Sequence, residues 1–186
     1  MNPEATTAEL TTISLPIPWE GLALPEPIQF DRTAVTYGDV GWAWSGNMPN
    51  LGVAVCDPSR GEAVAGWDLD HVVVLVPDLD AAVAEFTART ALSPVLRMRV
   101  KGRPAAHYRV GPLLEIIESP VRAATLYGIV LVTTEPLEVL ALRWRSMGRD
   151  VSGPTTALEP GRRILTLRDT EAGLAVMTPT VAVADH

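Results

Sequence analysis

From residue 67 onward, apolar and polar positions follow regular patterns that predict a strand, a helix and three further strands. The nearly continuous apolar run over 69–76 predicts a strand that is covered on both faces. Asp78 follows at the position of a helix N-cap, and a helix is expected over 79–90. Its buried stripe has i, i+4, i+7 spacing and consists of Leu79, Val83 and Phe86. Shorter strands are then expected at about 95–101, 105–110 and 113–118.

The same order of elements returns further along the chain. An apolar run over 126–132 predicts a strand, and a helix is expected to begin near Glu135 and Pro136 and to end at Gly148. The buried stripe of this helix consists of Leu137, Leu140, Trp144 and Met147. Weak strand signal at 149–152 precedes two clearer strands at 163–168 and 173–178.

The two copies are separated by a constant offset. His71 and Gly128, on the two first strands, lie 57 residues apart, and so do the helix starts Asp78 and Glu135. We therefore interpret the second part of the chain as a duplicated βαβββ unit and predict an α+β fold. The predicted organisation is an N-terminal extension (1–66), a first module (67–124) and a second module (125–186).

The N-terminal extension lacks this regularity. Four prolines between residues 16 and 27 predict an extended segment rather than a helix. Short β-like runs are expected at 28–37, 40–45 and 51–56. The last two flank a turn-forming segment, which predicts a hairpin. In a strand over 40–45, Trp42 and Trp44 share one face.

The composition limits the possible functions. A chain of 186 residues with 47% hydrophobic and 20% charged residues supports a sizeable core. The net charge of −7 argues against nucleic acid as a partner. The single cysteine, Cys56, excludes an internal disulfide framework and a cysteine-based zinc cluster. No apolar run reaches the ~18 residues of a membrane span, and the first ten residues lack the pattern of a secretory signal. We therefore expect a cytoplasmic protein with no membrane partner.

The first module opens with the run LDHVVVLVPDLD over 69–80. Together with the repeat behind it, this run resembles the vicinal oxygen chelate superfamily, which contains glyoxalase I, bleomycin-resistance proteins and extradiol dioxygenases. The resemblance covers about residues 67–180. It implies two βαβββ modules that form a cupped mixed β-sheet around a cavity. It also implies a divalent metal, held by the first and last strands of each module, that acts as a Lewis acid.

The resemblance places His71 at the metal-ligand position of the first strand and Glu115 at that of the last strand of module one. Module two departs from the pattern, because Gly128 stands where the second histidine would be, and the last strand offers Ala175 and Met177 in place of an acid. We therefore expect no cofactor and no stoichiometric metal. The alternative is Fe, Mn, Ni or Zn on the incomplete pair of His71 and Glu115.

The pairing of the strands at 105–110 and 113–118 decides which side chain faces Glu115. A two-residue turn at Gly111 and Pro112 places Tyr108 opposite Glu115 and turns His107 to the other face. A shift of one residue would reverse this arrangement. The catalytic candidates are His71, Glu115 and Tyr108.

Two classes of function follow. The first is a bleomycin-resistance-like protein that binds a largely apolar organic molecule between the modules. Its expected lining consists of Val73, Leu75, Gly128, Val130, Val132, Ala175 and Met177. The second is an enzyme of the isomerase, cyclase, lyase or dioxygenase type, with His71 and Glu115 as metal ligands or as an acid/base pair. Trp42 and Trp44 would either close the cavity as a lid or pack in the core of the extension. A homodimer is expected through edge strands.

Overall fold

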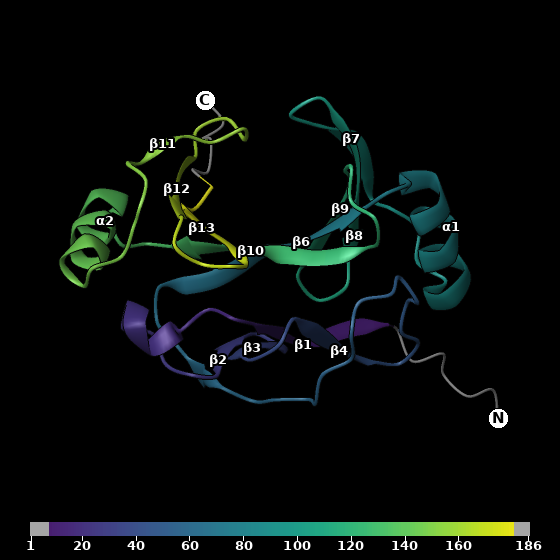
Figure 1. Ribbon diagram of the computed structural model, residues 1–186, viewed down its shortest axis with the longest axis horizontal. Coiled ribbons are helices and arrows are strands. Elements are labelled where there is room, and N and C mark those ends of the chain that lie inside the picture. The colour runs from purple at the N-terminus through teal and green to yellow at the C-terminus, as the bar shows by residue number, and fades with distance from the viewer. Residues whose placement is uncertain (1–7, 181–186) are drawn as a thin grey trace, which may run out of the picture.

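The computed structural model describes residues 8–180, which form two β-sheets (Figure 1). The larger sheet has eight strands in the order β11-β12-β13-β10-β6-β9-β8-β7. The first module contributes β6 (Trp67–Val76), α1 (Leu79–Thr90), β7 (Leu96–Val100), β8 (Arg103–Arg109) and β9 (Leu113–Glu118). The second module contributes β10 (Thr125–Thr133), α2 (Leu137–Ser146), β11 (Thr155–Thr156), β12 (Arg163–Leu167) and β13 (Gly173–Met177). The last six residues of the second module lie outside the described part.

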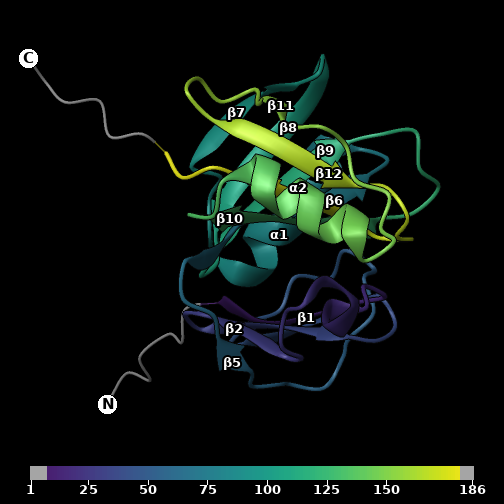
Figure 2. The ribbon, with the colours of Figure 1, turned by 90° about the vertical axis from the view of Figure 1, so that its left-hand side faces the viewer.

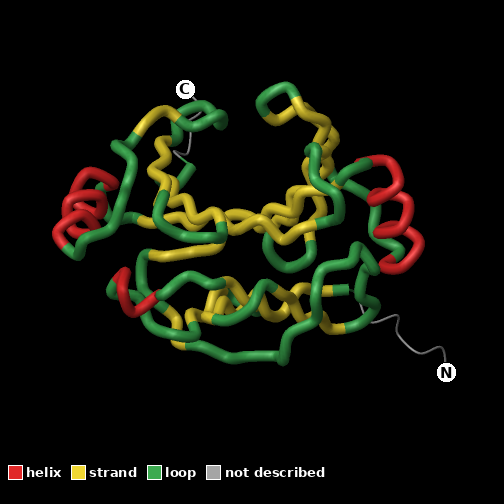
Figure 3. The backbone as a smooth tube through the Cα atoms, in the orientation of Figure 1, coloured by secondary structure: helices red, strands yellow, loops and turns green. Residues whose placement is uncertain are grey.

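The two modules meet where β6 and β10 pair antiparallel at the centre of the sheet. In each module the first strand pairs in parallel with the last, β6 with β9 and β10 with β13. The sheet curves upward at both ends, and α1 and α2 lie on its outer flanks (Figure 3). The predicted α+β fold, with two βαβββ modules and a cupped mixed sheet, is confirmed.

Both helices begin as the sequence predicts, but their buried stripes differ in detail. The Asp78 carboxylate accepts a hydrogen bond of 2.9 Å from the Ala81 N–H, which caps α1. Val83 is only half-buried in α1, since Ala82 takes the inward position. Met147 lies just beyond the end of α2 and is 41% exposed, so the last member of that predicted stripe is wrong.

The second sheet is built by the N-terminal extension and has the strand order β4-β1-β3-β2-β5. Its elements are β1 (Glu9–Leu15), the short 3-10 helix η1 (Trp19–Leu22), β2 (Ile28–Phe30), β3 (Thr33–Tyr37), β4 (Gly41–Ser45) and β5 (Glu62–Ala63). It lies against the convex face of the larger sheet (Figures 1 and 2). Side chains of both sheets form one continuous hydrophobic core.

Backbone and side-chain hydrogen bonds join the extension to the modules. The Leu10 N–H donates to the Val110 carbonyl at 2.7 Å. The buried Trp144 Nε1–H of α2 donates to the Leu22 carbonyl at 3.0 Å. The extension therefore packs on the outside of the cup. No helix within residues 8–180 is long and apolar enough to cross a membrane.

The extension differs from the sequence prediction in three places. Strand β1 lies before the proline-rich segment, in a stretch where no strand is predicted. The run at 28–37 is divided into β2 and β3 by a turn at Asp31, which has a φ of +46°. The predicted hairpin is wrong, because 51–56 contains no strand and Val55 makes only an isolated parallel bridge with Trp42.

Trp42 and Trp44 pack between the two sheets. Their rings meet edge to face with centroids 5.3 Å apart, and the Trp44 ring lies 6.0 Å from that of Phe86 on α1. Trp42 is 1% exposed. The lid interpretation is therefore wrong, because both rings lie on the convex side of the larger sheet, in the core of the molecule.

Candidate functional site

Side chains of β6 alternate between the two faces of the larger sheet. Val72 and Val74 belong to the main core on the convex side. Val73 belongs to a small separate cluster with Ala105 and Ile117, against which Leu75 packs on the concave side. His71 shares this concave face with Val73 and Leu75 by its position in the strand.

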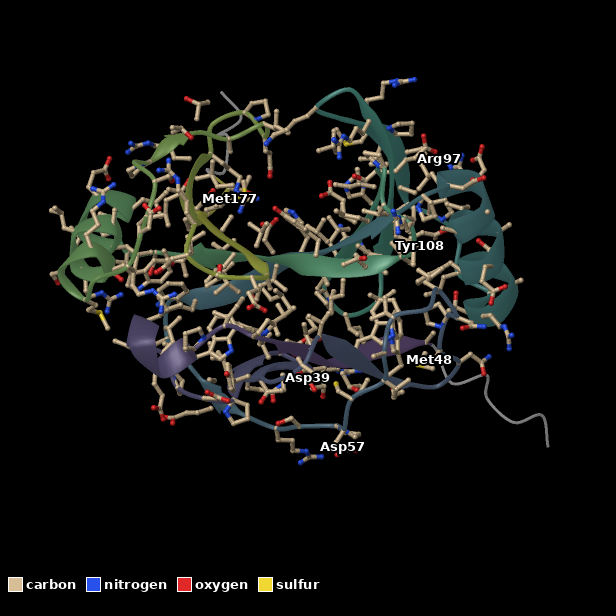
Figure 4. All side chains as sticks on the ribbon, in the orientation of Figure 1. Asp39, Met48, Asp57, Arg97, Tyr108 and Met177 are labelled. Atoms are coloured by element: carbon tan, nitrogen blue, oxygen red, sulfur yellow. The ribbon has the colours of Figure 1, made fainter. Side chains whose placement is uncertain are left out.

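The strand register places most of the predicted lining on the same face. Gly128 pairs with Val73, and Val130 pairs with His71. Across β10 and β13, the pairs are Val130 with Ala175 and Val132 with Met177. Paired residues point to the same side of a sheet, so module two contributes an apolar wall opposite the polar residues of module one. Figure 4 shows Met177 on this wall.

His107, and not Tyr108, lies beside Glu115. The loop between β8 and β9 has three residues rather than two, so Arg109 pairs with Leu113 and His107 pairs with Glu115. The His107 Nε2 lies 2.9 Å from the Glu115 Oε1. The predicted register is therefore wrong by one residue, and the alternative register is the correct one.

Tyr108 points to the convex side, where its ring centroid lies 4.1 Å from that of Phe86 (Figure 4). Burial raises the pKa of the Tyr108 hydroxyl. Tyr108 is thus a core residue, and the concave face presents His107 in its place.

His71 is held in position by its neighbour Asp70. The pairing of β6 with β10 shifts at this point, with His71 opposite Val130 and Leu69 opposite Leu131, so Asp70 is the extra residue of a β-bulge. The bulge brings the Asp70 carboxylate to the His71 side chain, where Oδ2 and Nδ1 are 2.7 Å apart. Since a carboxylate accepts hydrogen bonds, His71 donates to Asp70 through Nδ1, and Nε2 is turned toward Glu115.

Arg162 completes this arrangement from module two. Its side chain is 3% exposed, and its Nη2 lies 2.6 Å from the Asp70 Oδ1. The other nitrogens are also used, since Nη1 lies 2.6 Å from the Glu159 carboxylate and Nε–H donates to the Thr178 carbonyl. The positive charge of Arg162 is therefore balanced by two carboxylates of the protein, Asp70 and Glu159.

The contacts with His71 and Arg162 determine the charge of the Asp70 carboxyl group. Burial alone would raise the pKa of the Asp70 carboxyl, but its hydrogen bonds and charge interactions with His71 and Arg162 outweigh burial and lower the pKa. Burial would likewise lower the pKa of Arg162, yet Asp70 and Glu159 raise it. Asp70 is thus ionised at neutral pH and fixes the orientation of the His71 ring.

His71 and Glu115 face each other without a full hydrogen bond. The His71 Nε2 and the Glu115 Oε2 are 3.7 Å apart, and the two side chains are 19% and 11% exposed. His107 donates to the other oxygen of Glu115, so Oε2 is the oxygen that remains for His71 or for a ligand. The buried His107 Nδ1 has no hydrogen-bond partner within residues 8–180. His107 therefore contributes to this site through Nε2, which donates to Glu115.

These residues do not fit a divalent metal held as the resemblance implies. A Cβ atom at Gly128 would lie 1.9 Å from the Gly173 carbonyl oxygen, so no side chain fits at the position of the missing histidine. His107 uses Nε2 to donate to Glu115 and is not free to bind a cation there. In the part of the chain that the structure describes, no group of three or more His, Cys, Asp or Glu side chains is placed to hold a metal ion.

A surface hollow of about 480 Å³ lies elsewhere, on the N-terminal sheet. Pro18, Glu20, Glu26, Pro27 and Tyr37 line it. One of its acids is already used, since Glu26 accepts a hydrogen bond from the Tyr37 N–H. This hollow holds no histidine or cationic side chain, and the chemistry of the molecule is concentrated on the concave face instead.

Sequence reasoning found His71 and Glu115 but missed Asp70 and Arg162 as members of one site. Asp70 enters through a bulge, and Arg162 comes from the other module. An alternating pattern along a single strand contains no signal for either contact. The sequence offered His107 only through the alternative register of β8 against β9.

No protein-family model and no curated protein matches the sequence. Solved structures do match. Methylmalonyl-CoA epimerase from Mycobacterium tuberculosis has a TM-score of 0.50 at 16% identity, over 61% of this chain and 88% of that chain. The Streptomyces coelicolor methylmalonyl-CoA epimerase in complex with 2-nitronate-propionyl-CoA has a TM-score of 0.51 at 18% identity, over 63% and 97%. A hypothetical protein from Bacillus halodurans C-125 has a TM-score of 0.53 at 14% identity, over 64% and 99%.

The matched structures cover nearly two thirds of this chain, which is close to the share that the two modules occupy. At these identities the similarity concerns the fold. The paired βαβββ modules, the antiparallel contact between their first strands and the matched structures together show that the chain has the fold of the vicinal oxygen chelate superfamily.

Proposed function

We propose that the concave face of the larger sheet binds a small, largely apolar organic molecule. The observation that carries this proposal is the division of that face into a polar group and an apolar wall. His71 and Glu115 are both partly accessible, while module two presents Val130, Ala175 and Met177 beside them. Ligand sites commonly combine an apolar surface with a few placed polar groups.

Apolar contact would supply most of the affinity. A ligand that buries about 200 Å² of apolar surface gains about 5 kcal/mol before the cost of immobilising it. His71 and Glu115 would then fix its orientation, because a hydrogen-bonding group of the ligand can meet the His71 Nε2 or the Glu115 Oε2.

An acid/base enzyme is the second candidate, and the alignment of Asp70, His71 and Glu115 favours it. Asp70 holds the proton of His71 on Nδ1, which leaves Nε2 as a base. His71 would accept a proton from an acidic C–H or O–H group of the ligand. The Glu115 Oε2, 3.7 Å away, would then stabilise the imidazolium.

The ligands named for two of the matched structures support an acyl compound as the ligand in this proposal. Methylmalonyl-CoA epimerase has been crystallised with methylmalonyl-CoA and NH₄⁺ and also with 2-nitronate-propionyl-CoA. For the present chain, an acyl ligand is part of the proposal, and the identity of that ligand is the first thing to determine.

Native mass spectrometry of the protein purified from its own host tests the binding proposal. Ala175→Leu extends a side chain into the concave face, and Val139→Leu makes a matched change at an exposed position of α2. We expect a bound small molecule in the wild type and in Val139→Leu, and its loss in Ala175→Leu. Equal occupancy in all three proteins would contradict the proposal.

Incubation with the recovered molecule then separates the two candidates. Turnover that Glu115→Gln abolishes supports the acid/base enzyme. Binding without turnover, with only the affinity changed by Glu115→Gln, supports the binding protein.

We also propose that the protein is a cytoplasmic homodimer, with the edge strand β7 as the contact between the two copies. Strand β7 is the last strand of the larger sheet, and one of its sides carries no neighbouring strand. Light scattering at micromolar concentration is expected to give the mass of two chains. The mass of one chain would contradict the dimer.

A further inference from the structure

We infer that the ligand is an amphiphilic carboxylate, with its charged group at Arg109 and its apolar chain along the wall formed by β7 and β8. This inference rests on the proposed binding function and gives its ligand a chemical class. Two observations carry it, an exposed apolar strip on β7 and an arginine without a partner on β8.

The apolar strip lies on the concave side of β7. Leu96 pairs with His107 and Met98 pairs with Ala105, and both of these partners face the concave side. Leu96 and Met98 therefore also point to that side. They are 50% and 45% exposed, which is high for large apolar side chains in a strand.

The basic residues of β7 point the other way. The Arg97 Nη1 lies 2.9 Å from the Asp80 carboxylate of α1, as its position beside the helix in Figure 4 shows. Arg99 donates to the Gly102 carbonyl. The strand thus carries charge on its outer side, and its apolar side is turned toward the cup, where a ligand can cover it.

Arg109 stands at the end of this wall, on the same face as His107. It pairs with Leu113, which pairs in turn with His71 on β6, so these three residues form a row across the sheet. Arg109 is exposed and makes no ion pair and no side-chain hydrogen bond with any residue between 8 and 180. Arg103, on the same strand and face, differs in donating to the Ser119 hydroxyl at 2.6 Å.

The charges of the concave face favour an anion at Arg109. Asp70 is held by His71 and Arg162, and His107 holds one oxygen of Glu115, so the carboxylate oxygen left for a cationic ligand is the Glu115 Oε2 beside His71. The guanidinium of Arg162 is used by two carboxylates. The guanidinium of Arg109 pairs with no carboxylate of residues 8–180, and its planar shape allows it to hold both oxygens of a ligand carboxylate.

The spacing of the strand fits a ligand of moderate length. Arg109 and Ala105 are four residues apart on β8, a separation of about 13 Å along a strand. Met98 lies opposite Ala105 at the far end of this interval. An alkyl chain can therefore lie across Leu96 and Met98 while its carboxylate contacts Arg109.

The methionines provide reporters for the test. Met98 and Met177 lie on the concave face, whereas Met48 and Met147 lie elsewhere (Figure 4 labels Met48 and Met177). Met48, Met98 and Met147 are 38%, 45% and 41% exposed, so non-specific contact should affect all three alike. Protein labelled with ¹³C at the methionine methyl groups is titrated with octanoate and with octanamide, its neutral counterpart.

We expect octanoate to shift the Met98 methyl resonance and to leave those of Met48 and Met147 unchanged. Octanamide is expected to bind roughly tenfold more weakly, because it lacks the charge-assisted contact. Arg109→Gln should remove this difference, and Arg109→Lys should retain part of it. Arg103→Gln, the matched change on the same strand, should leave the difference unchanged.

The outcomes separate the inference from the proposed function. Equal binding of octanoate and octanamide at Met98 or Met177 would overturn the assignment of a carboxylate to Arg109 and leave the binding function standing. Loss of the octanoate preference in Arg103→Gln, but not in Arg109→Gln, would also overturn it. If neither probe shifts Met98 or Met177, the concave face is not a site for apolar ligands, and both proposals fail.

Discussion

The two modules share one fold but not one chemistry. Their repeat is visible in the sheet itself, since His71 pairs with Val130 and Gly128 pairs with Val73, with the offset of 57 residues on both strands. Glu115 is the parallel partner of Val73, and the corresponding partner of Val130 is Ala175. His71 and Glu115 of module one thus correspond to Gly128 and Ala175 of module two.

The comparison shows that the apolar positions that build the sheet and the polar side chains that form the site are different residues, so one set can vary while the other is kept. Alternating apolar positions keep β10 and β13 in the same arrangement as β6 and β9, although neither β10 nor β13 carries a histidine or an acidic residue. In module two the space of the missing histidine is filled by backbone, because Gly128 and Gly173 lie in close contact. Its polar contribution to the site is Arg162, which supports the histidine of the other module.

The largest effect is expected from a side chain at Gly128. Gly128→Ala places a methyl group 1.9 Å from the Gly173 carbonyl oxygen and should lower the free energy of unfolding by about 3 kcal/mol or more. Gly153→Ala, where no atom lies within 4 Å of the new Cβ, should change it by less than about 1 kcal/mol. Thermal unfolding measures both. A Gly128→Ala protein as stable as the wild type would show that module two still has room for a ligand side chain.

A smaller effect is expected from the ion pair that joins the modules. Arg162→Met leaves Asp70 and Glu159 without their buried cation and should cost about 2–4 kcal/mol of stability. Arg163→Met removes an exposed pair with Glu138 and should cost much less, because water and salt screen exposed charges. Urea unfolding at pH 7 gives both values. Equal losses for the two neighbouring arginines would contradict the structural role of Arg162.

The pH dependence of the Asp70 interaction has a definite sign. Its pKa is lowered in the folded protein, so its stabilising contribution is present above the unfolded pKa of about 3.9 and is lost as pH falls through the folded value. The stability difference between wild type and Asp70→Asn should therefore be largest near neutral pH and should shrink below about pH 4. A difference that grows on acidification would show that Asp70 is not the ionised partner of Arg162.

The register of β8 predicts opposite behaviour for two adjacent residues. His107→Phe leaves the buried Glu115 Oε1 without its donor and should destabilise the protein by about 1–3 kcal/mol. Tyr108→Phe keeps the core packing, and its hydroxyl has no hydrogen-bond partner in the described residues, so the loss should be within about 1 kcal/mol. A large loss for Tyr108→Phe together with a negligible one for His107→Phe would restore the register with Tyr108 beside Glu115.

Much of the modular fold could be predicted from the sequence, because long apolar strands and helical stripes carry periodic signals. Both helices and most strands between Trp67 and Met177 lie close to their predicted ranges. The strand predicted at 149–152 is wrong, because this stretch makes only an isolated bridge between Val151 and Leu167, and β11 lies further on, at Thr155–Thr156. Strand β1 was missed because Glu9–Leu15 mixes threonines with apolar residues and precedes a segment rich in proline. The predicted hairpin failed because two short β-like runs separated by a turn need not pair with each other.

The site was predictable only in part. His71 and Glu115 follow from their places on the first and last strands of module one. The contact of His107 with Glu115 depends on one residue of loop length, which the residues Gly111 and Pro112 do not decide. Asp70 and Arg162 meet through a bulge and across the two modules, which no local pattern encodes.

The central proposal is that Glu115 forms a hydrogen-bonded pair with His107 on the concave face, with His71 3.7 Å away, and that the two modules do not build a metal site. Elemental analysis of the protein, purified from its own host without chelator, tests this claim most directly. We predict far less than one Fe, Mn, Ni or Zn per chain, and the same low content in His71→Ala and Glu115→Ala. About one metal ion per chain in the wild type, lost in either variant, would contradict the claim and make His71 and Glu115 ligands of a metal centre.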